Sequence, residues 1–199
     1  MKLQYSDKEV IILPKVYEPA EDSFLMVEAV LREVQKSDRV LEIGTGSGII
    51  SMFVKDRAQV IATDISPQAV KCAKLNGIGV IRTDLFDGIN SKVKGKFDLI
   101  VFNPPYLPSE EQKTDMDVLW DGGSNGRATI NRFLEQVKDY LTEDGRILLL
   151  ASSLAGIEQI TARMKSIGLV VDEIMSEKHF FERLVVLRGF VKRKDKIFP

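Results

Sequence analysis

The segment Asn103–Tyr106, N-P-P-Y, carries the residues best suited to chemistry. An amide or arylamine nitrogen is a poor nucleophile because its lone pair is delocalised. The side-chain oxygen of Asn103 and the carbonyl of Pro104 could each accept a hydrogen bond from such a nitrogen, and both bonds strengthen as the nitrogen becomes positive. The prolines, Pro104 and Pro105, fix the backbone, and Tyr106 could lie over a planar group. The motif predicts alkylation of a planar nitrogen, although a strand-ending turn would use the same residues.

A glycine-rich segment, Val40–Gly48, has the sequence V-L-E-I-G-T-G-S-G. Glycines at 44 and 46 let the backbone turn tightly and approach a ligand closely. Their spacing, G-x-G-x-G, differs from the G-x-G-x-x-G of dinucleotide-binding loops. Glu42 would repel a pyrophosphate but attract the ammonium of a methionine moiety. The loop therefore predicts a ligand that carries an amino-acid group.

Two further acidic residues end the next apolar runs. Asp64 lies 20 residues after Gly44, where a carboxylate can accept hydrogen bonds from both hydroxyls of a ribose. Asp84 could accept one from an adenine amino group, while Leu85 packs on the ring. Either Asp alone is as readily a turn or helix cap. Together with Glu42, however, they lie at the carboxyl ends of successive strands, which is where open α/β sheets bind ligands.

The chain alternates apolar runs with amphipathic segments, which predicts strands alternating with helices and a mostly parallel, doubly wound α/β sheet. The predicted strands are Arg39–Ile43, Gln59–Thr63, Gly79–Arg82, Phe97–Phe102, Arg146–Ala151, Leu169–Ile174 and Leu184–Phe190. The predicted helices lie near Ala20–Glu33, Ile49–Asp56, Pro67–Asn76, Gly126–Leu141 and Ala155–Ile167. Only the short charged segment Ser176–Lys178 separates the last two strands, so these should pair antiparallel.

Length and composition favour one domain, residues 1–199, with a single core. A net charge of −1 gives no general attraction to nucleic acid, and the basic segment Lys192–Lys196 is interpreted as a solvated end. A lone cysteine, Cys72, which we expect to be a packed helix residue, and a lone histidine, His179, predict neither a disulfide nor a protein-bound metal. We find no membrane-length apolar run or secretory signal, so we expect a cytoplasmic protein.

Several motifs together resemble the HemK/PrmC family of protein glutamine methyltransferases. They are the E-x-G-x-G-x-G loop that begins at Glu42, the aspartate Asp64, the pair Asp84-Leu85, the N-P-P-Y segment, and V-Y-E-P-A-E-D-S at Val16–Ser23. The resemblance runs from about residue 14 to the end and lacks the N-terminal helical domain of bacterial members, as in the short archaeal and eukaryotic branch. It implies a class I, Rossmann-like methyltransferase with seven strands, one of them antiparallel, that uses S-adenosyl-L-methionine. The implied substrate is the glutamine amide in the Gly-Gly-Gln loop of a peptide-chain release factor.

The same resemblance assigns roles to individual residues. The implied contacts with S-adenosylmethionine are Ser23, Glu42, Gly44, Gly46, Asp64, Asp84, Leu85 and Asn103. The implied substrate-binding residues are Asn103, Pro104 and Tyr106, and the implied catalytic residues are Asn103, Pro104, Pro105 and Tyr106. Family members often have Thr where this chain has Ser23, which keeps the hydroxyl. Glu18, Glu21 and Asp22 could instead favour a helix N-terminus. Trp120–Gly123 with Asn125 and Gly126 resembles a substrate-side loop, but a helix-entry turn would explain it nearly as well.

Other functions stay open from sequence. N-P-P-Y would equally serve an adenine amino group in DNA or RNA, but enzymes that flip bases usually carry basic or target-recognition segments, which we do not find in this sequence. A protein lysine is a further alternative, although its ammonium must first lose a proton. A non-catalytic cofactor-binding subunit is the third, and the intact N-P-P-Y argues against it.

A partner protein is suggested by the third strand, Gly79–Arg82, which lies at a sheet edge in the strand order that the resemblance implies. The strand is apolar and has no Lys or Pro to discourage pairing with another chain. Members of the short branch work with a small zinc-binding activator protein, so we hypothesise that the activator adds a strand at this edge. The alternative is an edge covered by the chain's own loops.

Overall fold

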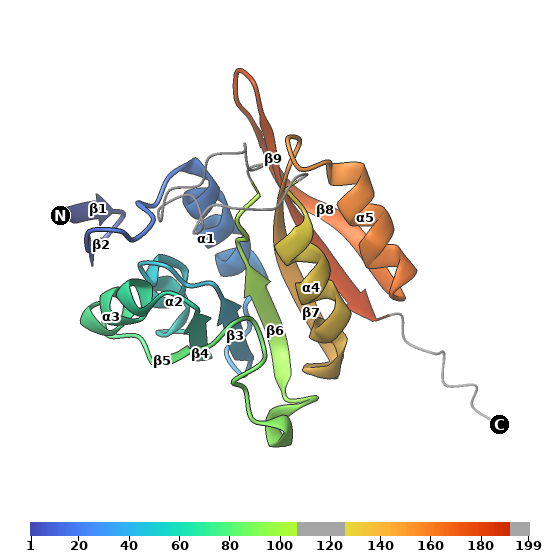
Figure 1. The fold of residues 1–199 in the computed structure, drawn as a ribbon, viewed down its shortest axis with the longest axis horizontal. Helices are drawn as coiled ribbons and strands as arrows, with labels where there is room; N and C mark the ends of the chain where they lie inside the picture. Colours follow the sequence, from blue (N-terminus) through green and yellow to red (C-terminus); the bar gives the residue numbers. More distant parts are fainter. Residues whose placement is uncertain (107–125, 192–199) are drawn as a thin grey trace.

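The computed structural model describes residues 1–106 and 126–191. Its centre is a seven-stranded sheet in the order β5-β4-β3-β6-β7-β9-β8 (Figure 1). The strands are β3 Arg39–Ile43, β4 Gln59–Asp64, β5 Val80–Arg82, β6 Phe97–Phe102, β7 Leu141–Ser152, β8 Leu169–Lys178 and β9 Arg183–Val191. β9 pairs antiparallel with both β7 and β8, and the other pairs are parallel. The predicted fold class and the single antiparallel strand are confirmed.

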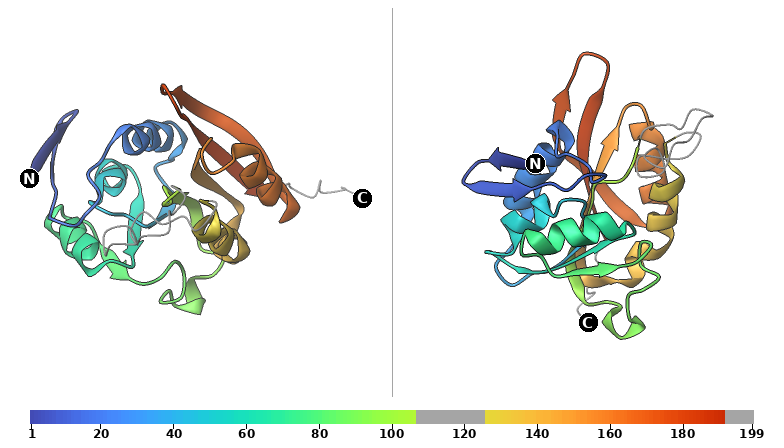
Figure 2. Two further views of the ribbon diagram at one scale, coloured as in Figure 1. Left: turned by 45° about the horizontal axis from the view of Figure 1, so that its top comes forward. Right: turned by 60° about the vertical axis from the view of Figure 1, so that its left-hand side comes forward.

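Helices cover both faces of the sheet (Figure 2). α1 (Glu21–Glu33), α2 (Ile49–Val54) and α3 (Pro67–Leu75) contribute to the apolar cluster on one face, and α4 (Ala128–Gln136) and α5 (Ile157–Ser166) to the cluster on the other. Ser66 caps α3, because its hydroxyl accepts a hydrogen bond from the Ala69 amide at 3.3 Å, and Pro67 occupies the first turn. Both features agree with the helix start read from the sequence.

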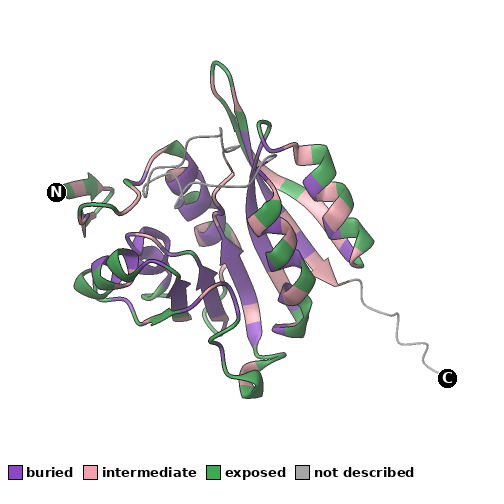
Figure 3. Ribbon diagram, viewed as in Figure 1, coloured by how far each residue is buried: buried purple, intermediate pink, exposed green. Residues whose placement is uncertain are grey.

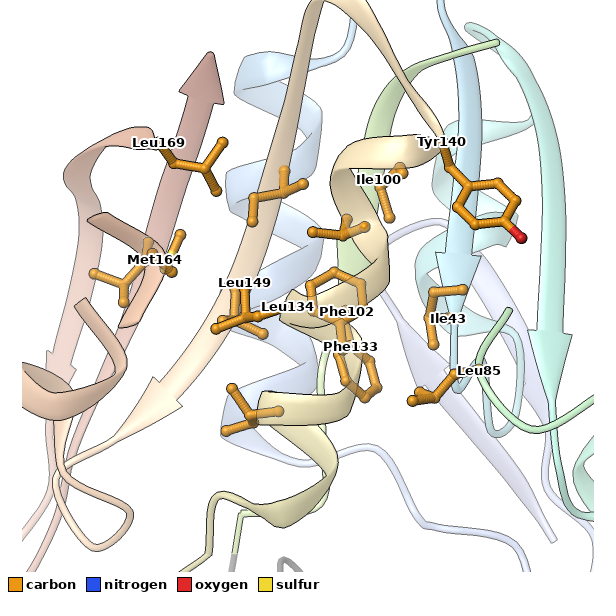
Figure 4. Packing of buried hydrophobic residues seen from close by; sticks show 14 of the residues in the cluster. Ile43, Leu85, Ile100, Phe102, Phe133, Leu134, Tyr140, Leu149, Met164 and Leu169 are labelled. Carbon is orange, nitrogen blue, oxygen red and sulfur yellow. The ribbon is translucent and has the colours of Figure 1, made fainter. Parts of the chain in front are cut away.

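The strands supply both clusters because successive side chains point to opposite faces. On β3, Leu41 and Ile43 join the cluster under α4 and α5, whereas Val40 joins the cluster under α1. The central strands are therefore buried on both sides, as Figure 3 shows. In the first cluster, Phe133 of α4 packs on Phe102 of β6 with ring centroids 4.8 Å apart (Figure 4). This packing fixes the end of β6, from which the N-P-P-Y segment continues.

Three features differ from the sequence prediction. An N-terminal hairpin, β1 (Lys2–Tyr5) with β2 (Lys8–Ile11), was not predicted, and Tyr5 stacks on Phe24 of α1 at 4.3 Å between centroids. The helix predicted to reach Leu141 ends at Gln136, followed by a 3-10 turn, because Leu141 already pairs with β6. Ser176–Lys178 continues β8, because it pairs with β9 instead of forming a loop. In each case a long-range contact outweighs the local pattern.

The remaining predictions concern Cys72, membrane-spanning helices, metal sites, the basic segment and the domain organisation. Cys72 is fully buried in α3, as expected. Among residues 1–106 and 126–191, no helix is long and apolar enough to cross a membrane, and no group of His, Cys, Asp and Glu side chains could hold a metal ion. The basic segment Lys192–Lys196 and the loop residues 120–125 lie outside the described residues, and the single-domain organisation stays a prediction.

Candidate active site

One cavity of about 380 Å³ lies at the carboxyl ends of the parallel strands, a size that is typical of small-molecule sites. Every residue that the sequence predicted for the cofactor or the reaction borders it. They are Ser23, Glu42, Gly44, Gly46, Asp64, Asp84, Leu85, Asn103, Pro104, Pro105 and Tyr106. The sheet therefore brings together residues that are up to 83 positions apart, from Ser23 to Tyr106. Of the predicted substrate-side loop, only Gly126 is described; a Cβ there would lie 2.3 Å from the Tyr106 carbonyl oxygen.

Asn103 has one end of its amide held and the other free. Its Nδ2 donates to Asp22 Oδ2 at 3.0 Å. Its Oδ1 is buried beside the cavity and has no hydrogen-bond partner among the described residues. Because a buried acceptor without a partner is costly, an N–H donor from a ligand would satisfy it. The amide is thus oriented to accept one hydrogen bond in the cavity.

Asp22 is the residue that fixes this orientation. It is 4% exposed in the first turn of α1, and its Oδ1 accepts hydrogen bonds from Tyr17 Oη at 2.8 Å and Ser23 Oγ at 3.1 Å. With Oδ1 occupied in this way, Oδ2 is left to face Asn103. Asp22 therefore supports the site through Asn103 instead of acting only as an acid at a helix N-terminus.

Glu42 and Asp64 place two carboxyl groups at the ends of β3 and β4. Burial raises the pKa of Glu42 to about 7, and hydrogen bonds from the Ser51 amide and hydroxyl oppose that shift. Burial also raises the pKa of Asp64, whose two oxygens accept from the amides of Gly46 and Ser66, both at 2.8 Å. These contacts orient the Asp64 carboxylate. The two side chains could take the ammonium and the ribose hydroxyls of a nucleoside-linked amino acid.

Asp84 lies two residues beyond β5, so it does not itself end the strand as the sequence suggested. Its Oδ2 accepts from Arg132 Nη2 of α4 at 2.8 Å, and Arg132 also borders the cavity. Leu85 beside it has φ +45°, a left-handed conformation that costs a non-glycine residue about 1–2 kcal/mol. The Leu85 side chain is 6% exposed and packs in the apolar cluster under α4 and α5, which stabilises this conformation.

The loop after β3 is shaped for close approach of a ligand. Gly44 and Gly46 have φ +65° and +56°, and a Cβ on Gly46 would meet no atom within 4 Å, so its outer face is open. Thr45 between them is buried and also borders the cavity. Open backbone and the two oriented carboxylates of Glu42 and Asp64 fit a ligand with ammonium and hydroxyl donors.

Sequence reasoning missed four contributors. Tyr17 and Asp22 belong to the V-Y-E-P-A-E-D-S segment, which signalled the region but not their contact with Asn103. Thr129 and Arg132 reach the cavity from α4, where an amphipathic helix pattern does not single out one polar side chain.

Comparisons with known proteins identify the family of this chain. The methyltransferase small domain matches residues 21–181. MJ0928 of Methanocaldococcus jannaschii, by name a protein N5-glutamine methyltransferase, is 39% identical over 89% of this chain and 92% of its own length. The chain belongs to this family of methyltransferases. Methyltransferase HEMK2 of Mus musculus is 37% identical over 87% and 88% of the two chains.

A solved structure agrees with this assignment. The methyltransferase superposes on a chain of the E. cuniculi Mtq2-Trm112 complex with a TM-score of 0.77 and 28% identity, covering 89% of this chain and 99% of that one. The HemK-type resemblance read from the sequence is confirmed, and so are the enzyme class and its cofactor, S-adenosylmethionine. That cofactor supplies a methyl group on a positively charged sulfur.

Proposed function

We propose that this methyltransferase methylates the side-chain amide of a glutamine in a peptide-chain release factor. The observation that carries the proposal is the buried Oδ1 of Asn103, which has no partner in the described part of the chain and is oriented by Asp22. A glutamine amide has two N–H donors on a planar nitrogen, which suits the two acceptors of N-P-P-Y. The named role of the Mtq2-Trm112 complex, methylation of the eRF1 translation termination factor, supports the same substrate class.

The residues of N-P-P-Y would act by binding the nitrogen more tightly in the transition state than in the ground state. Asn103 Oδ1 would accept one N–H and the Pro104 carbonyl the other. As positive charge grows on the nitrogen both hydrogen bonds strengthen, and the fixed backbone at Pro104 and Pro105 requires little reorganisation. Tyr106, half-buried at the cavity, would cover the planar amide.

On the cofactor side, Glu42 would hold the ammonium, Asp64 the ribose hydroxyls, and Asp84 with Leu85 the adenine. Ser23, Gly44, Gly46 and Asn103 would complete the cofactor pocket. The ion pair between Arg132 and Asp84 would fix the Asp84 carboxylate, leaving its second oxygen for the adenine amino group.

The affinity for S-adenosylmethionine should depend on pH through Glu42. Its carboxyl group has a pKa of about 7 because it is buried, and a bound ammonium favours the ionised form. Binding must therefore displace a proton below pH 7. We expect the dissociation constant to rise as the pH falls from about 7 to 5.5, approaching tenfold per pH unit. Calorimetric titrations across this range measure the slope.

The matched variant is Glu42→Gln. It should bind S-adenosylmethionine more weakly at neutral pH and lose most of the pH dependence, because the amide does not titrate. A wild-type profile that is flat between pH 5.5 and 7, or a Glu42→Gln profile as steep as the wild type, would contradict this role.

The decisive test of the substrate is methyl transfer from labelled S-adenosylmethionine. A release factor is offered beside its variant with Gln→Ala in the Gly-Gly-Gln loop, and DNA and RNA serve as controls. We expect label on the intact factor and none on the variant. Equal label on both factors would exclude that glutamine and favour a lysine. Each substrate is offered with and without the activator. Label on nucleic acid alone would establish the adenine alternative, and absence of transfer to every substrate in both conditions would favour a non-catalytic subunit. A release-factor substrate also implies a cytoplasmic enzyme.

A small partner protein at the β5 edge is the second part of the proposal, and we infer a zinc-binding activator. β5 is a terminal strand of the sheet, and Ile81 is 42% exposed. The E. cuniculi complex pairs Mtq2 with Trm112, which supports a partner of this kind. An extended segment of the activator could continue the sheet here.

Ile81→Lys should therefore weaken binding of the activator at least tenfold, because a lysine on an edge strand disfavours pairing with another chain. The affinity for S-adenosylmethionine should stay unchanged. Surface plasmon resonance with the purified activator measures the effect. Leu154→Lys is the control, since Leu154 is similarly exposed (47%) and lies beyond β7, away from this edge. Equal affinities for Ile81→Lys and Leu154→Lys would refute the edge assignment.

A further inference from the structure

The hairpin between β8 and β9 projects at the end of the sheet where the active site lies (Figures 1 and 2). β8 runs parallel to β3 and β6, because both it and β7 pair antiparallel with β9. Its carboxyl end therefore points the same way as the N-P-P-Y segment. The tip, His179–Glu182, is closed by the His179 amide, which donates to the Glu182 carbonyl at 2.7 Å.

Two adjacent aromatic rings stand exposed on this tip. Phe180 and Phe181 are 92% and 85% exposed and contact each other edge to face, with centroids 4.6 Å apart. Every other large apolar side chain in the described part of the chain is at most 64% exposed. Single exposed apolar residues are ordinary, but an adjacent aromatic pair on a projecting turn has the composition of a protein-binding surface.

A small hollow of about 70 Å³ lies between the hairpin and the N-terminal end of α1. Its walls are Tyr17, Ala20, Glu21, Asp22, Tyr106, His179, Glu182 and Leu184. Tyr17, Asp22 and Tyr106 also border the catalytic cavity. A chain that contacts the hairpin tip and lies along this hollow would therefore lie beside Asp22 and Tyr106, and Asp22 is the partner of Asn103.

The hollow is negatively charged. Glu21, Asp22 and Glu182 line it, and no Lys or Arg is among its described lining residues. Burial, followed by the negative charges of these three side chains, raises the pKa of Tyr106. A partner segment with a positively charged side chain would complement this charge.

We propose that the β8–β9 hairpin tip, Phe180 with Phe181, is the docking surface for the protein substrate. The aromatic pair packs on the domain that carries the target glutamine, and the hollow takes a Lys or Arg side chain near that glutamine. The inference rests on the proposed function and names how its substrate is recognised. The docking surface is separate from the proposed activator edge, because β8 and β5 are at opposite ends of the sheet.

The test is the steady-state kinetics of the enzyme with the whole release factor as substrate. In the double variant Phe180→Ser/Phe181→Ser we expect KM for the factor to rise about 10- to 30-fold, because exposed aromatic anchors dominate protein interfaces. The kcat and the dissociation constant of S-adenosylmethionine should stay within about twofold of wild type. Leu75→Ser, at an exposed apolar position (53%) on α3, is the matched control and should leave KM unchanged.

A charge variant tests the hollow. Glu21→Gln should raise KM for the factor and make its dependence on salt concentration less steep than in the wild type, because one attractive charge is lost. A wild-type salt dependence in this variant would overturn the positively charged contact.

The outcomes separate docking from function. Transfer to the factor with a wild-type KM in the double variant overturns the docking surface and leaves the proposed function intact. No transfer by the wild-type enzyme in the presence of the activator overturns the proposed function and, with it, the docking surface. If the double variant fails to bind S-adenosylmethionine, a photoreactive benzoylphenylalanine at position 180 replaces it as the test. Cross-linking to the factor from position 180, and not from 75, is expected, and its absence overturns the proposal.

Discussion

Asn103→Ala is expected to lower kcat for methyl transfer by about 100- to 1,000-fold, which is the usual effect of removing one preorganised hydrogen-bonding group from a transition state. The truncated side chain leaves the nitrogen with only the Pro104 carbonyl as an acceptor. The affinity for S-adenosylmethionine should largely survive, because Glu42 and Asp64 are held by their own hydrogen bonds to Ser51, Gly46 and Ser66. Single-turnover transfer and calorimetric binding of the cofactor give the two quantities separately.

Asn90→Ala is a suitable control, because Asn90 is exposed and its side chain accepts only the local Lys92 amide at 2.9 Å. This variant should keep wild-type kcat. A kcat for Asn103→Ala within a few-fold of wild type would exclude the proposed mechanism. An equal loss of cofactor affinity and kcat would instead mean that Asn103 serves the cofactor.

The core of the site could be predicted from sequence because its residues lie at the ends of strands. β3 and β6 are apolar runs that the structure reproduces from first to last residue, so Glu42 at the end of β3 and Asn103 just after β6 were placed correctly. Parallel strands bring their carboxyl ends to one edge of the sheet whatever their separation in sequence. Correct strands were therefore sufficient to predict which residues meet.

Contacts that depend on how the helices pack on the sheet could not be predicted from the sequence. The hydrogen bond between Asp22 and Asn103 spans 81 residues and forms only because α1 lies against the sheet. Arg132 reaches Asp84 from α4, and both side chains border the cavity. The N-terminal hairpin was missed for the same reason, since its strands are held by Tyr5 on Phe24 and by Asn76, which accepts from the Ile11 amide at 2.9 Å.

Asp22→Asn should lower kcat by about 10- to 150-fold, the loss that corresponds to about 1.5–3 kcal/mol for a hydrogen bond to a charged group. An asparagine at this position no longer dictates which end of the Asn103 amide faces it. The Asn103 side chain can then turn its NH2 into the cavity, where it cannot accept an N–H from the substrate. Tyr17→Phe, which removes the hydrogen bond from Tyr17 to Asp22 Oδ1, should have a smaller effect in the same direction.

A purely structural role for Asp22 is separated from an orienting role by exchanging the two side chains. In the double variant Asp22→Asn/Asn103→Asp, the amide at 22 can donate to one oxygen of the carboxylate at 103, and the other oxygen faces the cavity as an acceptor. Its kcat should exceed that of Asp22→Asn alone, because residues in direct contact have non-additive effects. If Asp22 merely stabilises the start of α1, the second substitution can only add damage. Additive losses in kcat, together with a lowered melting temperature for Asp22→Asn, would assign Asp22 to stability instead of to the orientation of Asn103.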